Sequence, residues 1–190
     1  MSRDHIERGL DSLANAATAS KQLSAQAVAV ASRYCAVLRD GGTLFFCGNG
    51  GSAADAQHLA AEYVVRYSAD RRPLAAIALT TDSSILTAAG NDLAFEQIFA
   101  RQVEALCGPG DLLVLHSSSG RSSNLLAAAK TARQRGAPSV AFLGKGGGPL
   151  AELVDLALII PSDNTSLVQL VQMALEHLIV ELVERELLRS

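Results

Sequence analysis

The residues from Thr43 to Glu62 constrain the fold more than any other part of the sequence. They begin with a short apolar run, residues 44–47, which is typical of a buried strand. The run ends at Gly48, Asn49, Gly50 and Gly51, and an alanine-rich segment starting at Ser52 predicts a helix. A strand, a glycine turn and a helix N-terminus form a common anion-binding unit, because free backbone N–H groups and the positive end of the helix dipole point into one concavity.

Apolar segments alternate with helical ones along the rest of the chain. We expect strands at residues 74–79, 112–115, 139–143 and 156–160, and helices at 83–89, 95–106, 124–135 and 165–188. Residues 90–92 are expected to form a turn. Short, unbroken apolar strands between helices indicate a parallel sheet covered on both faces. We therefore predict a single α/β domain over residues 1–190.

Residues 1–40 are expected to form a helical arm, and residues 41–190 the core with a closing C-terminal helix. The arm reads as helix over residues 4–39 with a junction at Ser20 and Lys21, and its apolar face can pack on its own sheet or on a second subunit.

A net charge of −3 without a polybasic block argues against nucleic-acid or membrane-surface binding. No apolar run approaches the roughly 18 residues that span a bilayer. The charged N-terminus and three cysteines without a C-x-x-C pair predict a cytoplasmic protein.

Polar residues follow several of the expected strands, where ligands bind in open parallel sheets. One such stretch, residues 117–123, holds five serines among seven residues. Small hydroxyl groups and one glycine before a helix can surround a phosphate with O–H and N–H donors. The alternative is an ordinary serine N-cap, but a cap requires only one serine. We therefore predict that this stretch binds phosphate, although the chain lacks the lysine of a nucleotide-binding P-loop at this point.

Residues 48–53 also match the G-x-G-x-x-A pattern of dinucleotide-binding folds. In those folds an acidic residue about 20 positions further on binds the ribose. Asp82 comes well past that point, and Glu62 lies within the predicted helix. The dinucleotide interpretation is therefore weak.

Two stretches offer candidate catalytic or metal-binding side chains. His58 and Glu62 stand at positions i and i+4 of the helix after the glycine turn, about 6 Å apart along its axis. They are either a solvated pair or part of a site, as zinc ligands or with Glu62 as a general base.

The closing helix carries Gln169, Gln172, Glu176 and His177 among apolar residues. Its periodicity does not distinguish a solvent-facing stripe from a buried site.

These residues together resemble the sugar-isomerase (SIS) domain of sedoheptulose-7-phosphate isomerases. The resemblance begins with the glycine turn, Ser52 and the His58-x-x-x-Glu62 pair. It continues through residues 78–92, 117–122 and 161–169 to the final histidine, His177, and so covers nearly the whole chain. It implies a three-layer, doubly wound, flavodoxin-like sheet of about five strands. It also implies a homotetramer that converts sedoheptulose 7-phosphate to D-glycero-D-manno-heptose 7-phosphate, with sites near subunit contacts.

The resemblance assigns roles residue by residue. It implies that Glu62 and His177 transfer the protons of the reaction. It implies one zinc ion per subunit, held by His58, Glu62, Gln169 and His177. It places the phosphate against the hydroxyl groups of Ser117, Ser118, Ser119 and Ser122. It lines the sugar pocket with Asn49, Gly50, Gly51, Ser52, Glu62, Asn91, Asp92 and Gln169.

The chain departs from the family pattern beside these residues. Ser118 and Arg121 replace a threonine and an asparagine of the phosphate loop, and Leu170 and Gln172 replace a glutamate and a histidine near the implied zinc. Two non-catalytic alternatives share the same fold: a protein that binds the bacterial replication initiator, and a regulatory sensor of sugar phosphates. The presence of both Glu62 and His177 favours an enzyme.

Overall fold

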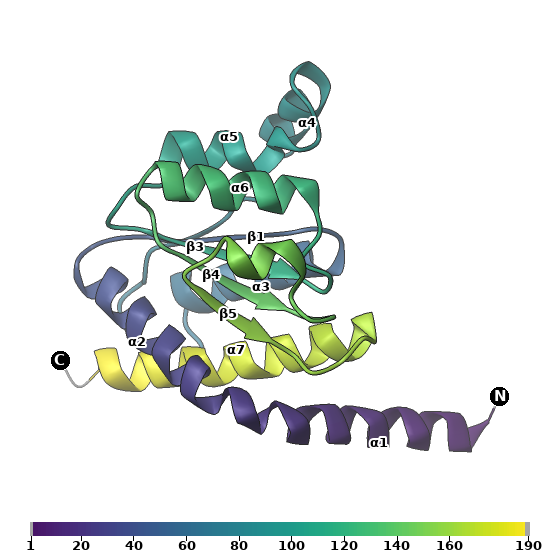
Figure 1. Cartoon of the computed structure of the whole chain (residues 1–190). Coiled ribbons are helices and arrows are strands. Elements are labelled where there is room, and N and C mark those ends of the chain that lie inside the picture. The colour runs from purple at the N-terminus through teal and green to yellow at the C-terminus, as the bar shows by residue number, and fades with distance from the viewer. Residues whose placement is uncertain (1, 189–190) are drawn as a thin grey trace.

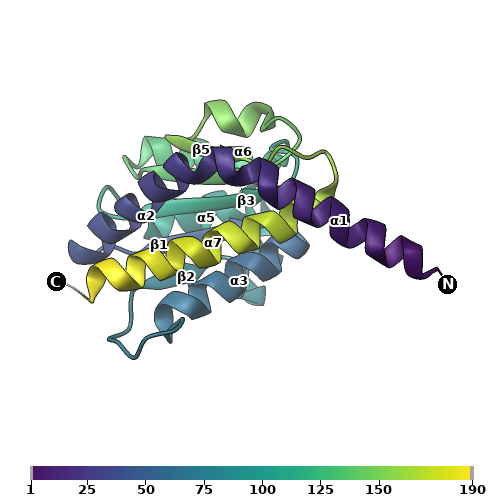
Figure 2. The same ribbon diagram turned by 90° about the horizontal axis from the view of Figure 1, so that it is seen from below.

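The computed structural model describes residues 2–188. Its sheet consists of strands β1 (Leu44–Gly48), β2 (Ala76–Ala78), β3 (Leu112–Ser117), β4 (Ser139–Leu143) and β5 (Leu156–Ile159). All neighbouring strands are parallel, in the order β2-β1-β3-β4-β5 (Figure 1; β2 is labelled in Figure 2). The order reverses direction at β1, so that β1 and β3 are neighbours and their carboxyl ends, Gly48 and His116, lie side by side. The predicted α/β fold with a five-stranded parallel sheet is confirmed.

Helices cover both faces of this sheet. The helices are α1 (Arg3–Ala19), α2 (Ser24–Arg39), α3 (Gly51–Val64), α4 (Ser83–Asp92), α5 (Gln97–Leu106), α6 (Ser123–Gln134) and α7 (Thr165–Leu187), with short 3₁₀ turns η1 (Ser20–Leu23) and η2 (Gly148–Glu152). Helices α2, α3 and α7 pack on one face, and α5 and α6 on the other (Figure 1).

The strands alternate between two separate apolar cores, because successive side chains of a strand point to opposite faces. Phe46, Val114 and Phe142 pack among the residues of α2, α3 and α7. Phe45 and Leu113 pack among the residues of α5 and α6. Both faces are therefore buried, which explains why the strands read as unbroken apolar runs in the sequence.

The N-terminal arm is helical with a break near its middle. The predicted junction at Ser20 and Lys21 is confirmed, because these residues begin the 3₁₀ turn between α1 and α2. Helix α1 projects away from the sheet beside α7 (Figure 2). Residues 1, 189 and 190 of the predicted domain lie outside the described residues, and the division into an arm and a core remains a prediction.

Several predicted boundaries differ from the structure. Residues 90–92 form the last turn of α4 instead of a separate turn, and the cap of this helix at Asp82 accepts a hydrogen bond from Ile85 N at 3.0 Å. A single glycine inside a helix costs only about 1 kcal/mol, so Gly90 does not end it. Strand β2 is shorter than expected and β3 longer, and η2 has no apolar periodicity that would predict it.

Helix α7 runs along the sheet and forms part of its core. By length and composition alone it could cross a membrane, although core helices of soluble proteins pass the same test. Val171 packs against the arm, while Ile179, Val180 and Val183 pack against the sheet and α2. Packing within the domain thus accounts for these apolar residues, whereas Leu170, Leu178 and Leu182 of α7 are exposed.

Candidate active site

The glycine turn after β1 has a path that side chains would block. Gly50 precedes α3 with φ of 56° and ψ of −122°, a conformation that residues with a side chain rarely adopt. A Cβ atom at Gly48 would lie 2.5 Å from the backbone oxygen of Ser52, and one at Gly51 would lie 2.5 Å from Nε2 of Gln169. The turn therefore brings the first turn of α3 close to β1 and lets the Gln169 side chain of α7 lie directly against the backbone.

The serine loop after β3 is held by its own hydrogen bonds. Ser117 Oγ accepts from Gly120 N at 3.0 Å, and Ser119 Oγ accepts from Arg121 N at 3.3 Å. Gly120 has φ of 62°, and a Cβ atom there would lie 1.8 Å from the backbone oxygen of Gly147. Ser122 stands at the N-cap of α6 without a side-chain capping bond among the described residues. Its hydroxyl group is therefore not used in the way that the N-cap alternative requires.

The glycine turn and the serine loop line one pocket of about 370 Å³. Helices α3, α6 and α7 all begin there. Gly51 and Thr165, the first residues of α3 and α7, line the pocket, and so does Ser122, the N-cap of α6. Because helix N-termini carry free N–H groups and a partial positive charge, three of them around one pocket favour an anionic ligand. The lining consists of Asn49, Gly51, Ser52, His116, Ser117, Ser118, Ser119, Ser122, Thr165 and Gln169.

Four of the predicted sugar-pocket residues lie outside this lining: Gly50, Glu62, Asn91 and Asp92. Gly50 lines a neighbouring pocket of about 270 Å³ together with Asn49 and Thr80. Asn91 and Asp92 lie on the last turn of α4, where Asn91 Nδ2 donates to Asp92 Oδ1 at 2.7 Å. Asp92 lines a different hollow, between α4 and α5. Within one chain, the structure does not bring Asn91 and Asp92 to the serine loop.

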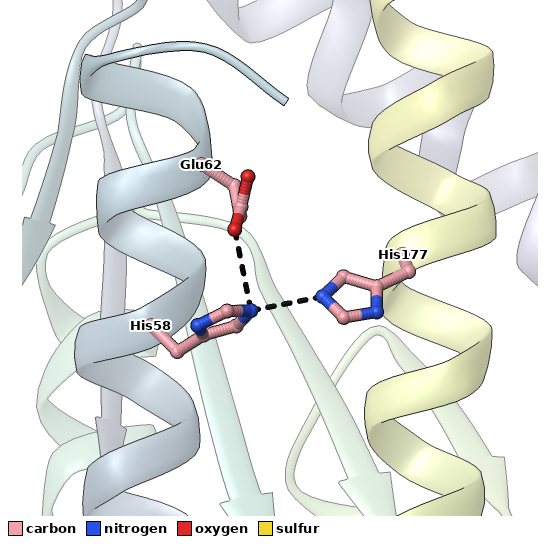
Figure 3. A group of neighbouring side chains, drawn as sticks. All are labelled: His58, Glu62 and His177. Atoms are coloured by element: carbon pink, nitrogen blue, oxygen red, sulfur yellow. Dashed lines mark hydrogen bonds and ion pairs between the residues drawn. The ribbon is translucent and has the colours of Figure 1, made fainter. Parts of the chain in front are cut away.

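His58, Glu62 and His177 gather between helices α3 and α7 (Figure 3). His58 Nε2 lies 3.3 Å from Glu62 Oε1 and 2.9 Å from His177 Nε2. The His58 side chain is 46% exposed and that of Glu62 19% exposed, so the group is open to a ligand on one side. Two imidazole nitrogens and one carboxylate oxygen, all within 4.8 Å of one another, are a donor set typical of catalytic zinc.

Gln169 is the fourth residue of the implied zinc site. It lies on α7 eight residues before His177, which corresponds to about 12 Å along the helix axis. The structure places its amide against Gly51 in the serine pocket. Gln169 therefore links the pocket to α7, and its predicted role as a metal ligand remains a prediction.

A buried ion pair lies behind the site. His116 Nε2 lies 2.9 Å from Glu176 Oε2, and both side chains are inaccessible to solvent. The imidazole ring stacks between Phe46 and Phe142, with ring centroids 6.1 and 5.6 Å away. His116 directly precedes the serine loop and Glu176 directly precedes His177. The pair therefore joins the strand that carries the loop to the helix that carries His177.

Burial and mutual attraction act in opposite directions on the titration of this pair. Burial lowers the pKa of His116, but the nearby carboxylate of Glu176 outweighs it, so that this pKa is raised. Burial raises the pKa of Glu176 more than His116 lowers it. Both shifts favour the protonated forms, so at least one proton stays between the two side chains.

Sequence reasoning missed this interior pair. The solvent-stripe interpretation of the closing helix is wrong for Gln172 and Glu176, because both are buried. Thr165 was not singled out either, although it begins α7 at the pocket. The polar residues inside so apolar a helix were the one available signal. The partner of Glu176, His116, is 60 residues away in sequence, and only the tertiary structure brings the two into contact.

The fold and the site define a class of protein. A model of the SIS domain matches residues 10–144, and the chain belongs to this family. Phosphoheptose isomerase from Roseiflexus sp. (strain RS-1) is 52% identical over 160 residues, which cover 84% of this chain and 81% of that one. Phosphoheptose isomerase from Bradyrhizobium sp. (strain BTAi1) is 47% identical over 186 residues, 98% of this chain and 93% of that one.

Solved structures agree with this assignment. The phosphoheptose isomerase of Neisseria gonorrhoeae superposes with a TM-score of 0.92 at 36% identity, covering 96% of this chain and 98% of that one. The chain is thus similar to phosphoheptose isomerases both in sequence and in its backbone path over nearly its whole length.

Proposed function

We propose that the protein is a phosphoheptose isomerase, a ketose–aldose isomerase that interconverts sedoheptulose 7-phosphate and D-glycero-D-manno-heptose 7-phosphate. The observation that carries the proposal is the gathering of His58, Glu62 and His177 on α3 and α7. These are two of the three helices whose N-termini line the serine pocket. Relatives that are about half identical over most of the chain bear the name of this enzyme.

The serine pocket is suited to the phosphate group of the substrate. We assign the phosphate to the hydroxyl groups of Ser117, Ser118, Ser119 and Ser122 and to the helix N-termini around them. The sugar hydroxyl groups would then meet the polar groups of Asn49, Gly50, Gly51, Ser52 and Gln169. Asn91 and Asp92 lie outside the pocket lining, and their part in sugar binding remains a prediction.

Glu62 and His177 are suited to the two proton transfers of the isomerisation. As a carboxylate, Glu62 accepts a proton from C1 of the ketose and returns it to C2 of the enediol. His177 moves a second proton between the oxygens on C1 and C2. Each proton and electron pair that leaves one atom arrives at its neighbour, so the reaction requires no co-substrate. Groups positioned in this way typically contribute about 10² to 10⁴ each to the rate.

The proposed zinc ion fits the residues that are present. His58, Glu62 and His177 offer three donor atoms within 4.8 Å of one another, and Gln169 would complete the set by resemblance. Zinc would polarise the carbonyl and hydroxyl oxygens of the substrate. His58 Nε2 and His177 Nε2 lie 2.9 Å apart, so both nitrogens are close enough to bind the same ion. His58 would serve to hold and orient, while Glu62 and His177 move protons.

Removing divalent metal should reduce turnover, and zinc should restore it. We expect chelated protein to lose most of its isomerase activity and to regain it with about one zinc per chain, because zinc stabilises developing negative charge on the substrate oxygens. Metal content is measured by elemental analysis beside the activity. His58→Ala should retain less zinc than the parent under the same dialysis. Full activity in metal-free protein would contradict a role for zinc.

Ser119→Ala should mainly weaken substrate binding. A hydrogen bond to a charged group contributes about 1.5 to 3 kcal/mol, so KM should rise about tenfold or more while kcat changes less. Ser123→Ala is the matched control. Ser123 follows the same loop, but its hydroxyl contacts Glu96 Oε1 at 3.3 Å instead of lining the pocket. An unchanged KM in Ser119→Ala would remove this residue from phosphate binding.

We further propose a cytoplasmic homotetramer, as the family resemblance implies. Exposed apolar side chains support a subunit contact: Ile6 and Leu10 on the projecting helix α1 are each 62% exposed, and Leu178 on α7 is 56% exposed. The non-catalytic alternatives, a partner of a replication initiator or a sugar-phosphate sensor, are not favoured. The relatives are named as isomerases, and Glu62 and His177 are both present.

A further inference from the structure

The connection between α3 and β2 is held by one buried carboxylate. Glu184, on α7, accepts hydrogen bonds from the backbone N–H groups of Tyr67, Ser68 and Ala69 at 2.9, 3.0 and 3.1 Å. It also accepts from Ser68 Oγ at 3.0 Å and from Arg71 Nε at 2.8 Å. The Glu184 and Arg71 side chains are only 2% and 3% exposed. Both carboxylate oxygens are therefore fully engaged in holding this loop.

The electrostatics agree with a fixed, ionised anchor. Burial alone would raise the pKa of Glu184, but the N–H groups of Tyr67, Ser68 and Ala69 outweigh it and lower that pKa to about 2. The carboxylate therefore remains charged at any pH at which the enzyme would work. Loop residues are usually mobile unless their backbone is bonded in this way.

The anchored loop places an aromatic ring on His177. The rings of Tyr67 and His177 are stacked, with centroids 5.4 Å apart and an interplanar angle of 26°. His58 approaches His177 on an edge, with ring centroids 5.1 Å apart and an angle of 68°. The last torsion of a histidine side chain has only broad minima, so that neighbours decide its ring orientation. Here Tyr67 restricts the imidazole from one face while His58 meets it from the side.

Arg71, the partner of Glu184, also contacts the backbone at Glu62, the other proton-transfer residue. Arg71 Nη2 donates to the backbone oxygen of Glu62 at 2.7 Å, and Arg71 Nη1 donates to that of Tyr63 at 2.9 Å. These carbonyl groups belong to the last turn of α3, which has no further helical N–H group to satisfy them. A guanidinium at a helix C-terminus also interacts favourably with the helix dipole. Arg71 therefore fixes the turn of α3 from which Glu62 extends.

We infer that Tyr67 is a positioning residue for His177, and that the buried pair of Glu184 and Arg71 holds Tyr67 and the Glu62 turn in one fixed arrangement. Glu62 and His177 lie on different helices, and a proton-transfer pair must keep a fixed spacing to act on adjacent carbons of one substrate. The loop of residues 67–71 supplies that connection between the helices. The inference rests on the proposed function for its catalytic meaning, while the ring contact itself can be tested without turnover.

The first test compares Tyr67→Leu with Tyr67→Phe. Leucine removes the aromatic face, and we expect kcat to fall about tenfold with KM changed less than about twofold, because a small misplacement of a catalytic group acts on the chemical step. Phenylalanine keeps the ring and should restore kcat. Val65→Ala is the control: Val65 lies in the same connection and is exposed, away from this contact. A wild-type kcat in Tyr67→Leu would overturn the inference.

A second measurement reports on the ring contact directly. In protein labelled with ¹³C at histidine Cε1, the His177 signal is identified by its loss in His177→Gln. Tyr67→Leu should shift this signal, because the ring current of the stacked tyrosine is lost, whereas Tyr67→Phe should leave it nearly in place. If the wild-type protein does not isomerise the sugar phosphate, the proposed function fails. The signal alone then decides the positioning role, and an unmoved signal in Tyr67→Leu overturns it.

Glu184→Gln tests the anchor. An amide has one acceptor oxygen in place of two and adds an N–H₂ group facing the loop donors, so the loop should loosen and kcat should fall as in Tyr67→Leu. Because loss of the Glu184 contacts already releases Tyr67, adding Tyr67→Leu to Glu184→Gln should cost little more than Glu184→Gln alone. If the decreases in kcat of the two single variants multiply in the double variant, Glu184 and Tyr67 act independently, and the proposed role of Glu184 in holding Tyr67 is overturned. Should Glu184→Gln fail to fold, the Tyr67 variants still decide the positioning role.

Discussion

Replacing Glu62 by glutamine lowers kcat for sedoheptulose 7-phosphate by about 10² to 10⁴, the usual contribution of a positioned acid or base. Glutamine has nearly the same shape as glutamate but cannot accept the proton from carbon. Glu62 does not line the serine pocket, which lies at the N-termini of α3, α6 and α7, so the pocket should keep its affinity for the phosphosugar. The expected result is therefore a protein that binds substrate and does not convert it.

The measurement pairs turnover with binding of the sugar phosphate by calorimetry, in protein of known zinc content. Glu104→Gln is the matched control, since Glu104 lies on α5 in an exposed ion pair with Arg101. That variant should retain both binding and turnover. Equal activity in Glu62→Gln would remove Glu62 from the mechanism. Loss of binding together with turnover would show that Glu62 is needed to hold the substrate, and the loss of turnover could then not be assigned to proton transfer.

Glu176→Leu destabilises the fold by about 3 to 5 kcal/mol, the usual cost of removing one partner of a buried pair. His116 then stays in the core between Phe46 and Phe142 without the carboxylate to which it is hydrogen-bonded. A polar ring that is buried without its partner loses its solvation and gains nothing in return. The change is measured as the free energy of unfolding in urea.

The double variant His116→Leu/Glu176→Leu tests whether the loss of stability in Glu176→Leu comes from leaving His116 without its partner. When both partners become apolar, no uncompensated polar group remains, and such replacements are often neutral or stabilising. We therefore expect the double variant to unfold at nearly the urea concentration of the parent. The two substitutions should be strongly non-additive, as for residues in direct contact. A double variant that loses the sum of the single losses would contradict a direct pairing in the folded state.

The fold was predictable because its signals are local. Each strand of the sheet appears as a short apolar run, and each run is followed by small or polar residues or by proline: Gly48, Thr80, His116 with Ser117, Gly144 and Pro161. The boundary at Asp92 was not predictable from Gly90 and its polar neighbours. Whether a polar, glycine-containing segment continues a helix depends on what packs beside it, and here Ile98 of α5 lies 3.8 Å from a Cβ atom built at Gly90.

Contacts of the candidate site were predictable where the residues lie close together in the sequence. His58 and Glu62 share one helix face by spacing alone, and the structure brings them together with His177. The contact of His58 with His177 spans 119 residues, and no pattern within either helix indicates it. The stack of Tyr67 on His177 and the bond of His116 to Glu176 are equally non-local. Asn91 and Asp92 were assigned from resemblance, and a single chain does not bring them to the pocket.

Gly120 bears on how enzymes of this kind can diverge. The backbone of Gly147 excludes a side chain at this position. The carbonyl oxygen of Gly120 also accepts a hydrogen bond from Leu150 N at 3.1 Å. The path of the loop is therefore set by contacts outside the serines themselves. Arg121, the next residue, is exposed and free of that contact. Single substitutions at position 121 can thus change the charge beside the serine loop without a compensating change of backbone.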